Sequence, residues 1–197
     1  MPRKANVRDS RLIVIATEGE KTEKQYFENL FDSPNIQVKI LETKPDDGSA
    51  PRYVFERLDA YQKSCDIQGD DELWLMTDVD RWEVKELKTV CRLAKQKGFF
   101  VAISNPCFEL WLRLHFAEAD VNDTICKALK ARLKAELGSY NWAKLDLKLY
   151  TAENVALAIQ RAQALDQDAT AMWPQFPGTH IYKLAQRLIN HFQPFQP

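Results

Sequence analysis

Four short strand candidates, each followed by a polar turn and an amphipathic helix, constrain this chain more than any other feature. The candidate strands cover residues 11–17, 35–42, 72–77 and 99–104. The first of them, RLIVIAT, is β-branched and almost continuously apolar, as is typical of a strand buried on both faces of a parallel sheet. Helical patterns follow at residues 22–31, 53–61, 84–97 and 107–116. Strands that alternate with helices predict βαβ units, and therefore an α/β fold with a mainly parallel sheet flanked by helices.

The pattern changes after about residue 120. Helical patterns rich in Ala, Leu, Lys and Gln cover residues 122–137, 152–172 and 181–192, and no strand pattern stands out there. We therefore predict an α/β core over residues 1–118 and a helical C-terminal region, residues 119–197, packed on it. A chain of 197 residues with 45% hydrophobic residues is long and apolar enough for one such core.

Composition limits the setting in which the chain works. The formal net charge is -1, so a contact with phosphates would require a local patch, a metal or a partner. The N-terminal residues lack the apolar stretch of a secretion signal, and no apolar run approaches the length of about 18 residues that spans a membrane. The cysteines form no C-x-x-C pair, and reduced thiols in a cytoplasmic protein are the simplest interpretation of Cys65, Cys91, Cys107 and Cys126.

Glu18 stands directly after the first predicted strand, where open α/β sheets place ligand sites. Gly19 would let the backbone turn tightly into the next helix. The alternative is an acidic helix start, in which carboxylates favour the positive end of the helix dipole. That alternative accounts for Glu20 and Glu23, but Glu18 belongs to the strand edge, so we predict it as a site residue.

Asp78 and Asp80 follow the third predicted strand as an Asp-x-Asp pair. Residues two apart in an extended chain point to the same side, and two like charges held close favour a cation between them. Oxygen ligands favour Mg²⁺ or Mn²⁺ over zinc. The alternative is a solvated turn in which Arg81 neutralises one carboxylate.

Taken together, these residues resemble the arrangement of the Toprim superfamily, which includes topoisomerases, primases and the OLD family of nucleases. That resemblance implies that Asp78 and Asp80 hold a divalent metal, and that Glu18 serves as general acid or base or as a further ligand. A metal in such a site offsets the charge that develops on a transferring phosphoryl group and lowers the pKa of an attacking water.

A longer motif makes the resemblance more specific. The segments are EGEKTE at residues 18–23, Asp-x-Asp at 78–80, SNPCFELW at 104–111 followed by His-Phe at 115–116, and THIYKL at 179–184. Together they resemble the RloB-like family over nearly the whole chain. Relatives often have Asp-Arg-Asp at the third strand, where this chain has Val79 between the aspartates.

The resemblance implies a Toprim-like protein of bacterial defence. It implies an ATPase partner, a role in abortive responses to phage, and a metal-dependent nuclease or phosphodiesterase activity on nucleic acid or a nucleotide.

Glu109 could join Glu18, Asp78 and Asp80 around the metal, or it could pair with a basic side chain. Cys107 is more readily interpreted as a buried structural thiol than as a nucleophile. His115 lies six residues after Glu109, on the opposite helical face, and is interpreted as a surface or core-edge residue rather than a ligand.

Three residues are candidate phosphate contacts. Lys21 lies at the start of a helix, a position that suits a phosphate, although it could instead pair with a neighbouring glutamate. Ser49 and Arg52 follow the Gly48 loop and could face the same site.

Three classes of function remain open on the sequence. The first is a divalent-metal-dependent nuclease or phosphodiesterase, which predicts that Glu18, Asp78 and Asp80 converge. The second is a catalytically silent module that senses a nucleotide or a partner and works with an ATPase, and it predicts binding without turnover. The third is a purely structural partner of an ATPase, which predicts scattered acidic residues and an exposed apolar face on the helical region.

Overall fold

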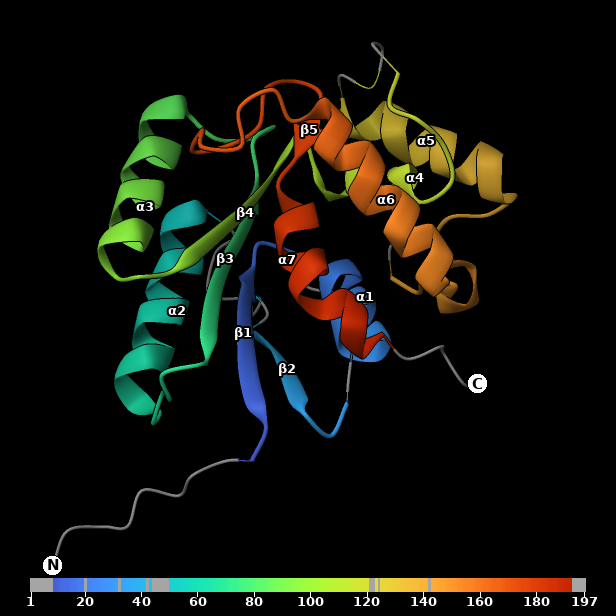
Figure 1. Ribbon diagram of the computed structural model, residues 1–197. Coiled ribbons are helices and arrows are strands. Elements are labelled where there is room, and N and C mark those ends of the chain that lie inside the picture. The colour runs from blue at the N-terminus through green and yellow to red at the C-terminus, as the bar shows by residue number, and fades with distance from the viewer. Residues whose placement is uncertain are drawn as a thin grey trace, which may run out of the picture.

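A five-stranded, mostly parallel sheet forms the centre of the protein (Figure 1). The computed structural model describes residues 9–19, 21–31, 33–41, 43, 50–120, 123, 125–141 and 143–192. The strand order is β2-β1-β3-β4-β5, and only β5 runs antiparallel to its neighbour. The strands are β1 Arg11–Thr17, β2 Ile36–Leu41, β3 Glu72–Asp78, β4 Phe100–Asn105 and β5 Gly178–Thr179. The predicted α/β fold with a mainly parallel sheet is confirmed.

Helices cover both faces of this sheet. They are α1 Thr22–Leu30, α2 Pro51–Ser64, α3 Val84–Gln96, α4 Phe108–Leu114, α5 Cys126–Leu137, α6 Ala152–Leu165 and α7 Ile181–Leu188, with short 3₁₀ turns at Leu147–Leu149 and Ile189–His191. Helices α2 and α3 lie on one face, while α1 and α7 lie on the other, with α4, α5 and α6 packed beyond them (Figure 1). In the part of the chain that the structure describes, no helix has both the length and the apolarity that crossing a bilayer requires.

Alternate residues of the buried strands supply two separate cores. In β1, Val14 packs towards α2 and α3, whereas Ile13 and Ile15 belong to the core on the opposite face. All three are fully buried, as expected of a strand enclosed on both sides. The period-two alternation of a strand therefore explains why an unbroken apolar run is needed at this position.

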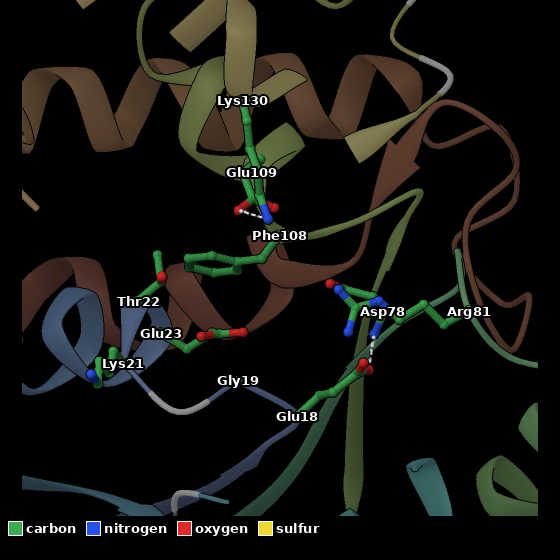
Figure 2. Close-up of a pocket in the computed structure, with 10 residues that line it drawn as sticks. All are labelled: Glu18, Gly19, Lys21, Thr22, Glu23, Asp78, Arg81, Phe108, Glu109 and Lys130. Atoms are coloured by element: carbon green, nitrogen blue, oxygen red, sulfur yellow. Dashed lines mark hydrogen bonds and ion pairs between the residues drawn. The ribbon is translucent and has the colours of Figure 1, made fainter. Parts of the chain in front are cut away.

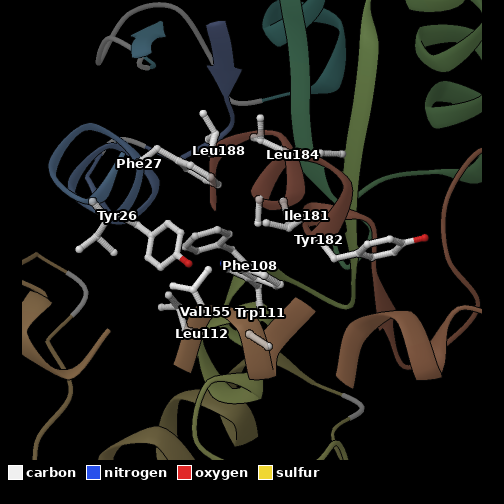
Figure 3. Close-up of a cluster of buried hydrophobic side chains, with 14 of the residues drawn as sticks. Tyr26, Phe27, Phe108, Trp111, Leu112, Val155, Ile181, Tyr182, Leu184 and Leu188 are labelled. Carbon is white, nitrogen blue, oxygen red and sulfur yellow. The ribbon is translucent and has the colours of Figure 1, made fainter. Parts of the chain in front are cut away.

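Aromatic side chains fill the larger of the two cores (Figure 3). The ring of Tyr26 on α1 makes edge-to-face contacts with Phe108 and Trp111 on α4, at centroid distances of 5.9 and 6.3 Å. Its hydroxyl lies 2.8 Å from Nε2 of His115, which is 1% exposed. His115 is therefore a core residue rather than a surface one, and its other ring nitrogen, Nδ1, lies 2.9 Å from the carbonyl oxygen of Trp111.

The C-terminal region departs from the sequence prediction in three places. Helix α6 ends at Leu165 rather than near residue 172. Beyond it, Asp166 accepts a hydrogen bond from the Tyr182 hydroxyl of α7, and Asp168 accepts one from the nearby Thr170 hydroxyl, a local contact of the kind that competes with a helix. The two-residue strand β5 was not predicted, since so short a strand leaves no periodic pattern. Helix α7 ends at Leu188, and a 3₁₀ turn follows it.

Part of the C-terminal region completes the sheet and its core. Strand β5 pairs with β4 through Ser104 and Thr179, whose hydroxyls are 2.8 Å apart. The aromatic core includes Tyr26 and Trp111 from before residue 118, and Val155 and Leu184 from after it (Figure 3). The division at residue 118 stays a prediction, and the shared core means that the two parts are packed together.

Two of the cysteines are not reduced in this structure. Cys107 and Cys126 form a disulfide that joins the start of α4 to the start of α5, so the expectation of free thiols is wrong for this pair. It failed because the two cysteines are 19 positions apart in the sequence, and only the packing of α5 on α4 brings them together. Cys65 and Cys91 are free, the former exposed and the latter buried.

Candidate functional site

A polar cleft opens at the carboxyl ends of β1, β3 and β4, the edge where parallel α/β sheets bind ligands (Figure 2). Its volume is ≈ 300 Å³. The lining residues are Glu18, Gly19, Lys21, Thr22, Glu23, Asp78, Arg81, Phe108, Glu109 and Lys130. The cleft therefore contains three of the four predicted catalytic residues, together with acidic and basic side chains that the sequence did not single out.

Glu18 is held in one orientation by three hydrogen-bond donors. The hydroxyl of Thr77 and the indole N–H of Trp82 donate to its Oε2 at 2.8 and 3.0 Å, and the backbone N–H of Asp78 does so at 3.3 Å. Burial raises the pKa of Glu18 above its ordinary value despite these donors. Sequence reasoning found Glu18 but missed Thr77 and Trp82, whose contacts depend on the packing of β3 beside β1.

Asp78, the last residue of β3, lies at the electrostatic centre of the site. Burial raises its pKa well above the ordinary value, and the negative charges of Glu18, Glu23, Glu109 and Asp80 raise it further. A carboxylate surrounded by other carboxylates is stable in its charged form only when a cation or a proton compensates it. The site is thus built to attract positive charge.

Glu23 is a site residue that the sequence prediction set aside as a helix-dipole residue. It is 8% exposed, and burial together with the charges of Glu109 and Glu18 raises its pKa to about 7. A Cβ at position 19 would overlap the Glu23 carboxylate, so Gly19 allows the backbone to approach it. The signal was present in the sequence, because Glu23 shares the buried helical face of Tyr26, Phe27 and Leu30.

Asp80 does not line the cleft. Its Oδ1 lies 4.0 Å from Nε of Arg81, the pairing that the solvated-turn alternative expected, and its Oδ2 lies 3.0 Å from Sγ of Cys126. Burial is the main cause that raises its pKa, and Glu109 adds to it. Asp80 therefore lies beside the cleft, towards α5, and affects the site through its negative charge.

Glu109 pairs with a basic side chain, one of the two alternatives that the sequence left open, while its role as a metal ligand stays a prediction. It lines the cleft, and its Oε1 pairs with Nζ of Lys130 at 3.3 Å (Figure 2). The same oxygen accepts a hydrogen bond from the Tyr140 hydroxyl at 3.1 Å. Lys130 comes from α5, so the C-terminal region contributes a wall of the cleft. No local pattern could have placed Lys130 here.

The three predicted phosphate contacts have different outcomes. Lys21 lines the cleft near the start of α1, and its contact with a phosphate stays a prediction. Ser49 lies outside the described residues. Arg52 does not line the cleft: it pairs with Glu56 at 2.8 Å on α2 and borders a separate groove between α2 and α3. Arg81 and Lys130 stand in the cleft as further cations.

Comparison with known proteins adds one finding to this geometry. A sequence model of the RloB-like protein family matches residues 13–188. The chain belongs to the RloB-like protein family. No curated protein and no solved structure matches it.

The RloB-like match includes every segment from which the cleft is built. Glu18, Asp78 and Glu109 lie in three of the four segments that carried the resemblance, and these three segments meet at one edge of the sheet. In the described part of the chain, however, no three carboxylates have oxygen atoms that all lie within 4.8 Å of one another. Within the described part of the chain, the group of three candidate ligands whose atoms lie within 4.8 Å of one another is Cys107, Glu109 and Cys126.

Proposed function

We propose that the cleft binds Mg²⁺ or Mn²⁺ and hydrolyses phosphodiester bonds in a nucleic acid or a nucleotide, as a Toprim-type site would. The observation that carries this proposal is the place of Asp78, a partly exposed carboxylate at the carboxyl end of a parallel strand that lines one cleft with Glu18, Glu23 and Glu109. Desolvation, and then the charges of its carboxylate neighbours, raise its pKa. Such a cluster costs free energy in the apo protein and suits a divalent cation.

The ligand chemistry supports a hard cation. Glu18, Glu23 and Asp78 offer carboxylate oxygens to one cleft, and Mg²⁺ is usually held by one or two carboxylates with water and substrate phosphates. In this proposal Asp78 and Glu18 hold the ion, and Asp80 adds negative charge beside it. A bound ion would neutralise charge on the phosphate and lower the pKa of a water molecule.

The remaining residues of the cleft would act without binding the metal. Glu23, with a pKa of about 7, can exchange a proton near neutral pH, as a general acid or base must. Lys21, Arg81 and Lys130 supply positive charge on the walls of the cleft, where they would orient an anionic phosphate. The Phe108 ring offers an apolar surface in the same cleft.

The biological setting that we propose is the one that the resemblance implies. The protein would act in anti-phage defence by abortive infection, with an ATPase as its partner. A net charge of -1 fits this arrangement, because a chain without an overall positive charge would depend on a partner to retain a long nucleic acid.

The test is metal binding by isothermal titration calorimetry with Mn²⁺ and Mg²⁺. We expect Asp78→Ala/Asp80→Ala to abolish binding, and Glu153→Gln, an exposed carboxylate on α6, to leave it unchanged. A screen of single-stranded DNA, RNA and cyclic dinucleotides would follow, with Glu18→Gln as the inactive control.

The outcomes separate the proposal from its alternative. Metal-dependent cleavage that Glu18→Gln abolishes would support the nuclease. Binding of metal and ligand without turnover would replace it with a silent sensor module. Absence of metal binding at millimolar concentrations, with and without an oligonucleotide, would overturn the metal site itself.

A further inference from the structure

Two sulfurs and two carboxylates gather beside the cleft, on the side of α5. The Sγ atoms of Cys107 and Cys126 and a carboxylate oxygen of Glu109 lie within 4.8 Å of one another. Asp80 adds its Oδ2 at 3.0 Å from Sγ of Cys126. The proposed phosphodiesterase chemistry uses oxygen ligands, so it gives the two cysteines no role.

We propose that reduction of the Cys107–Cys126 disulfide creates a second metal site, specific for Zn²⁺ or a similar thiophilic ion. The two thiolates would be its sulfur ligands, and Glu109 and Asp80 would supply oxygen. Thiolate ligands select zinc and other soft ions, whereas Mg²⁺ and Mn²⁺ prefer oxygen. Two sulfur and two oxygen ligands make four in all, the number that zinc prefers in a tetrahedral site.

The chemistry balances with a dithiol reductant. Two electrons and two protons convert the disulfide into the thiols of Cys107 and Cys126, while the reductant becomes a disulfide. Binding of Zn²⁺ then releases the thiol protons to solvent. Exchange with an oxidised dithiol reverses the sequence: its disulfide takes two electrons from the two thiolates and becomes the dithiol, the Cys107–Cys126 bond re-forms, and the ion loses its sulfur ligands.

The two cysteines stay close when the disulfide opens, because other contacts hold α5 against α4. Leu129 and Leu133 of α5 are fully buried in the aromatic core. Arg113 of α4, itself buried, pairs with Asp123 at 2.5 Å and with Glu136 at 3.1 Å, near the two ends of α5.

The spacing of the two cysteines also suits a shared ion. Their Cα atoms are 6.0 Å apart. Zinc–sulfur bonds of about 2.3 Å place two sulfurs about 3.8 Å apart in a tetrahedral site. Rotation of the two side chains can reach this separation without moving either helix.

The inference is independent of the proposed catalytic activity, because its readout is thiolate coordination. The full-length chain is reduced with a phosphine and titrated with Co²⁺, whose thiolate complexes show charge-transfer absorbance in the near ultraviolet; Zn²⁺ then displaces the cobalt. A parallel sample keeps the disulfide. Variants are Cys126→Ser, Glu109→Gln, and Cys65→Ser as the matched control at an exposed cysteine.

We expect the charge-transfer band in the reduced wild type and in Cys65→Ser. We expect its loss in Cys126→Ser and in the oxidised wild type, and weaker Zn²⁺ retention in Glu109→Gln. The comparison of oxidised and reduced wild type decides the question even if a variant fails to fold. A reduced wild type without the band, or a Cys126→Ser protein that keeps it, would overturn the proposal.

Discussion

The two faces of the sheet are built from different parts of the chain. The core under α2 and α3 is mostly aliphatic and draws its buried residues from Leu12 to Phe99. The opposite core is rich in aromatic rings and draws its buried residues from Ile13 to Leu188. The first face can form from neighbouring βαβ units, whereas the second is complete only when the C-terminal helices are in place.

This difference matters for the cleft, which belongs to the aromatic side. Glu23 lies on α1, Glu109 on α4 and Lys130 on α5, and all three helices pack on or beyond that face. The carboxylates at the strand ends are thus fixed by the sheet, while the walls around them depend on residues distant in sequence. A perturbation of the aromatic core should reach the site more readily than one beneath α2 and α3.

The largest expected effect comes from removing the C-terminal region. A chain that ends at residue 118 leaves β4 without β5 and α7, and it exposes the rings of Tyr26, Phe108 and Trp111. We expect it to lose cooperative thermal unfolding and near-ultraviolet circular dichroism. A chain that ends at residue 192 keeps every described residue and serves as the control. Cooperative melting of the shorter chain would instead make residues 119–197 an appended unit.

One substitution in each core compares the two faces of the sheet. Trp111→Ala should lower the free energy of unfolding by about 3–5 kcal/mol, because the ring is fully buried among aromatic neighbours. Val54→Ala on α2 should cost about 1.5–2 kcal/mol, from two methyl groups at about 0.8 kcal/mol each. Urea unfolding measures both, and Mn²⁺ affinity of the folded fraction should fall only for Trp111→Ala. Equal loss of affinity in both variants would contradict the link between the aromatic core and the cleft.

The acidic cleft should make the apo protein less stable as the pH rises. Glu23 has a pKa of about 7 in the folded protein against an ordinary 4.5, so folding favours its protonated form. This contribution is fully present below pH 4.5 and is lost as the pH rises through 7. At about 1.4 kcal/mol for each pKa unit, Glu23→Gln should recover about 3 kcal/mol at pH 8 and little at pH 4.5.

Thermal melts in EDTA at the two pH values test this expectation. The variant should keep part of the wild-type pH dependence, because the pKa values of Glu18 and Asp78 are raised in the same direction. Glu153→Gln is the control for loss of an exposed carboxylate. A Glu23→Gln protein with the wild-type slope between pH 4.5 and 8 would show that Glu23 is not buried against the other carboxylates.

Local pattern was sufficient for the four parallel strands, although not for β5, and for Glu18 and Asp78 at the ends of β1 and β3. Residues 11–17 could be assigned because the apolar run is short and rich in β-branched residues, and Glu18 and Asp78 followed because parallel strands end at a common edge. Contacts that depend on the packing of helices distant in sequence could not be predicted from local pattern. Lys130 and the Cys107–Cys126 pair are of this kind, since nothing near them in sequence indicates that α5 packs beside α4.

The smallest expected effect separates the cleft from the face under α2 and α3. Lys130→Ala should weaken the binding of a fluorescent single-stranded oligonucleotide, measured with Mn²⁺, by about tenfold, because a charge-assisted hydrogen bond contributes about 1.5–3 kcal/mol. Arg52→Ala should leave that affinity and the melting temperature unchanged, because its exposed side chain pairs with Glu56 away from the cleft. Should Arg52→Ala weaken binding as much as Lys130→Ala, the start of α2 would have to take part in the site after all. Ligand contacts would then extend to both faces of the sheet, and the two faces would differ only in how they affect stability.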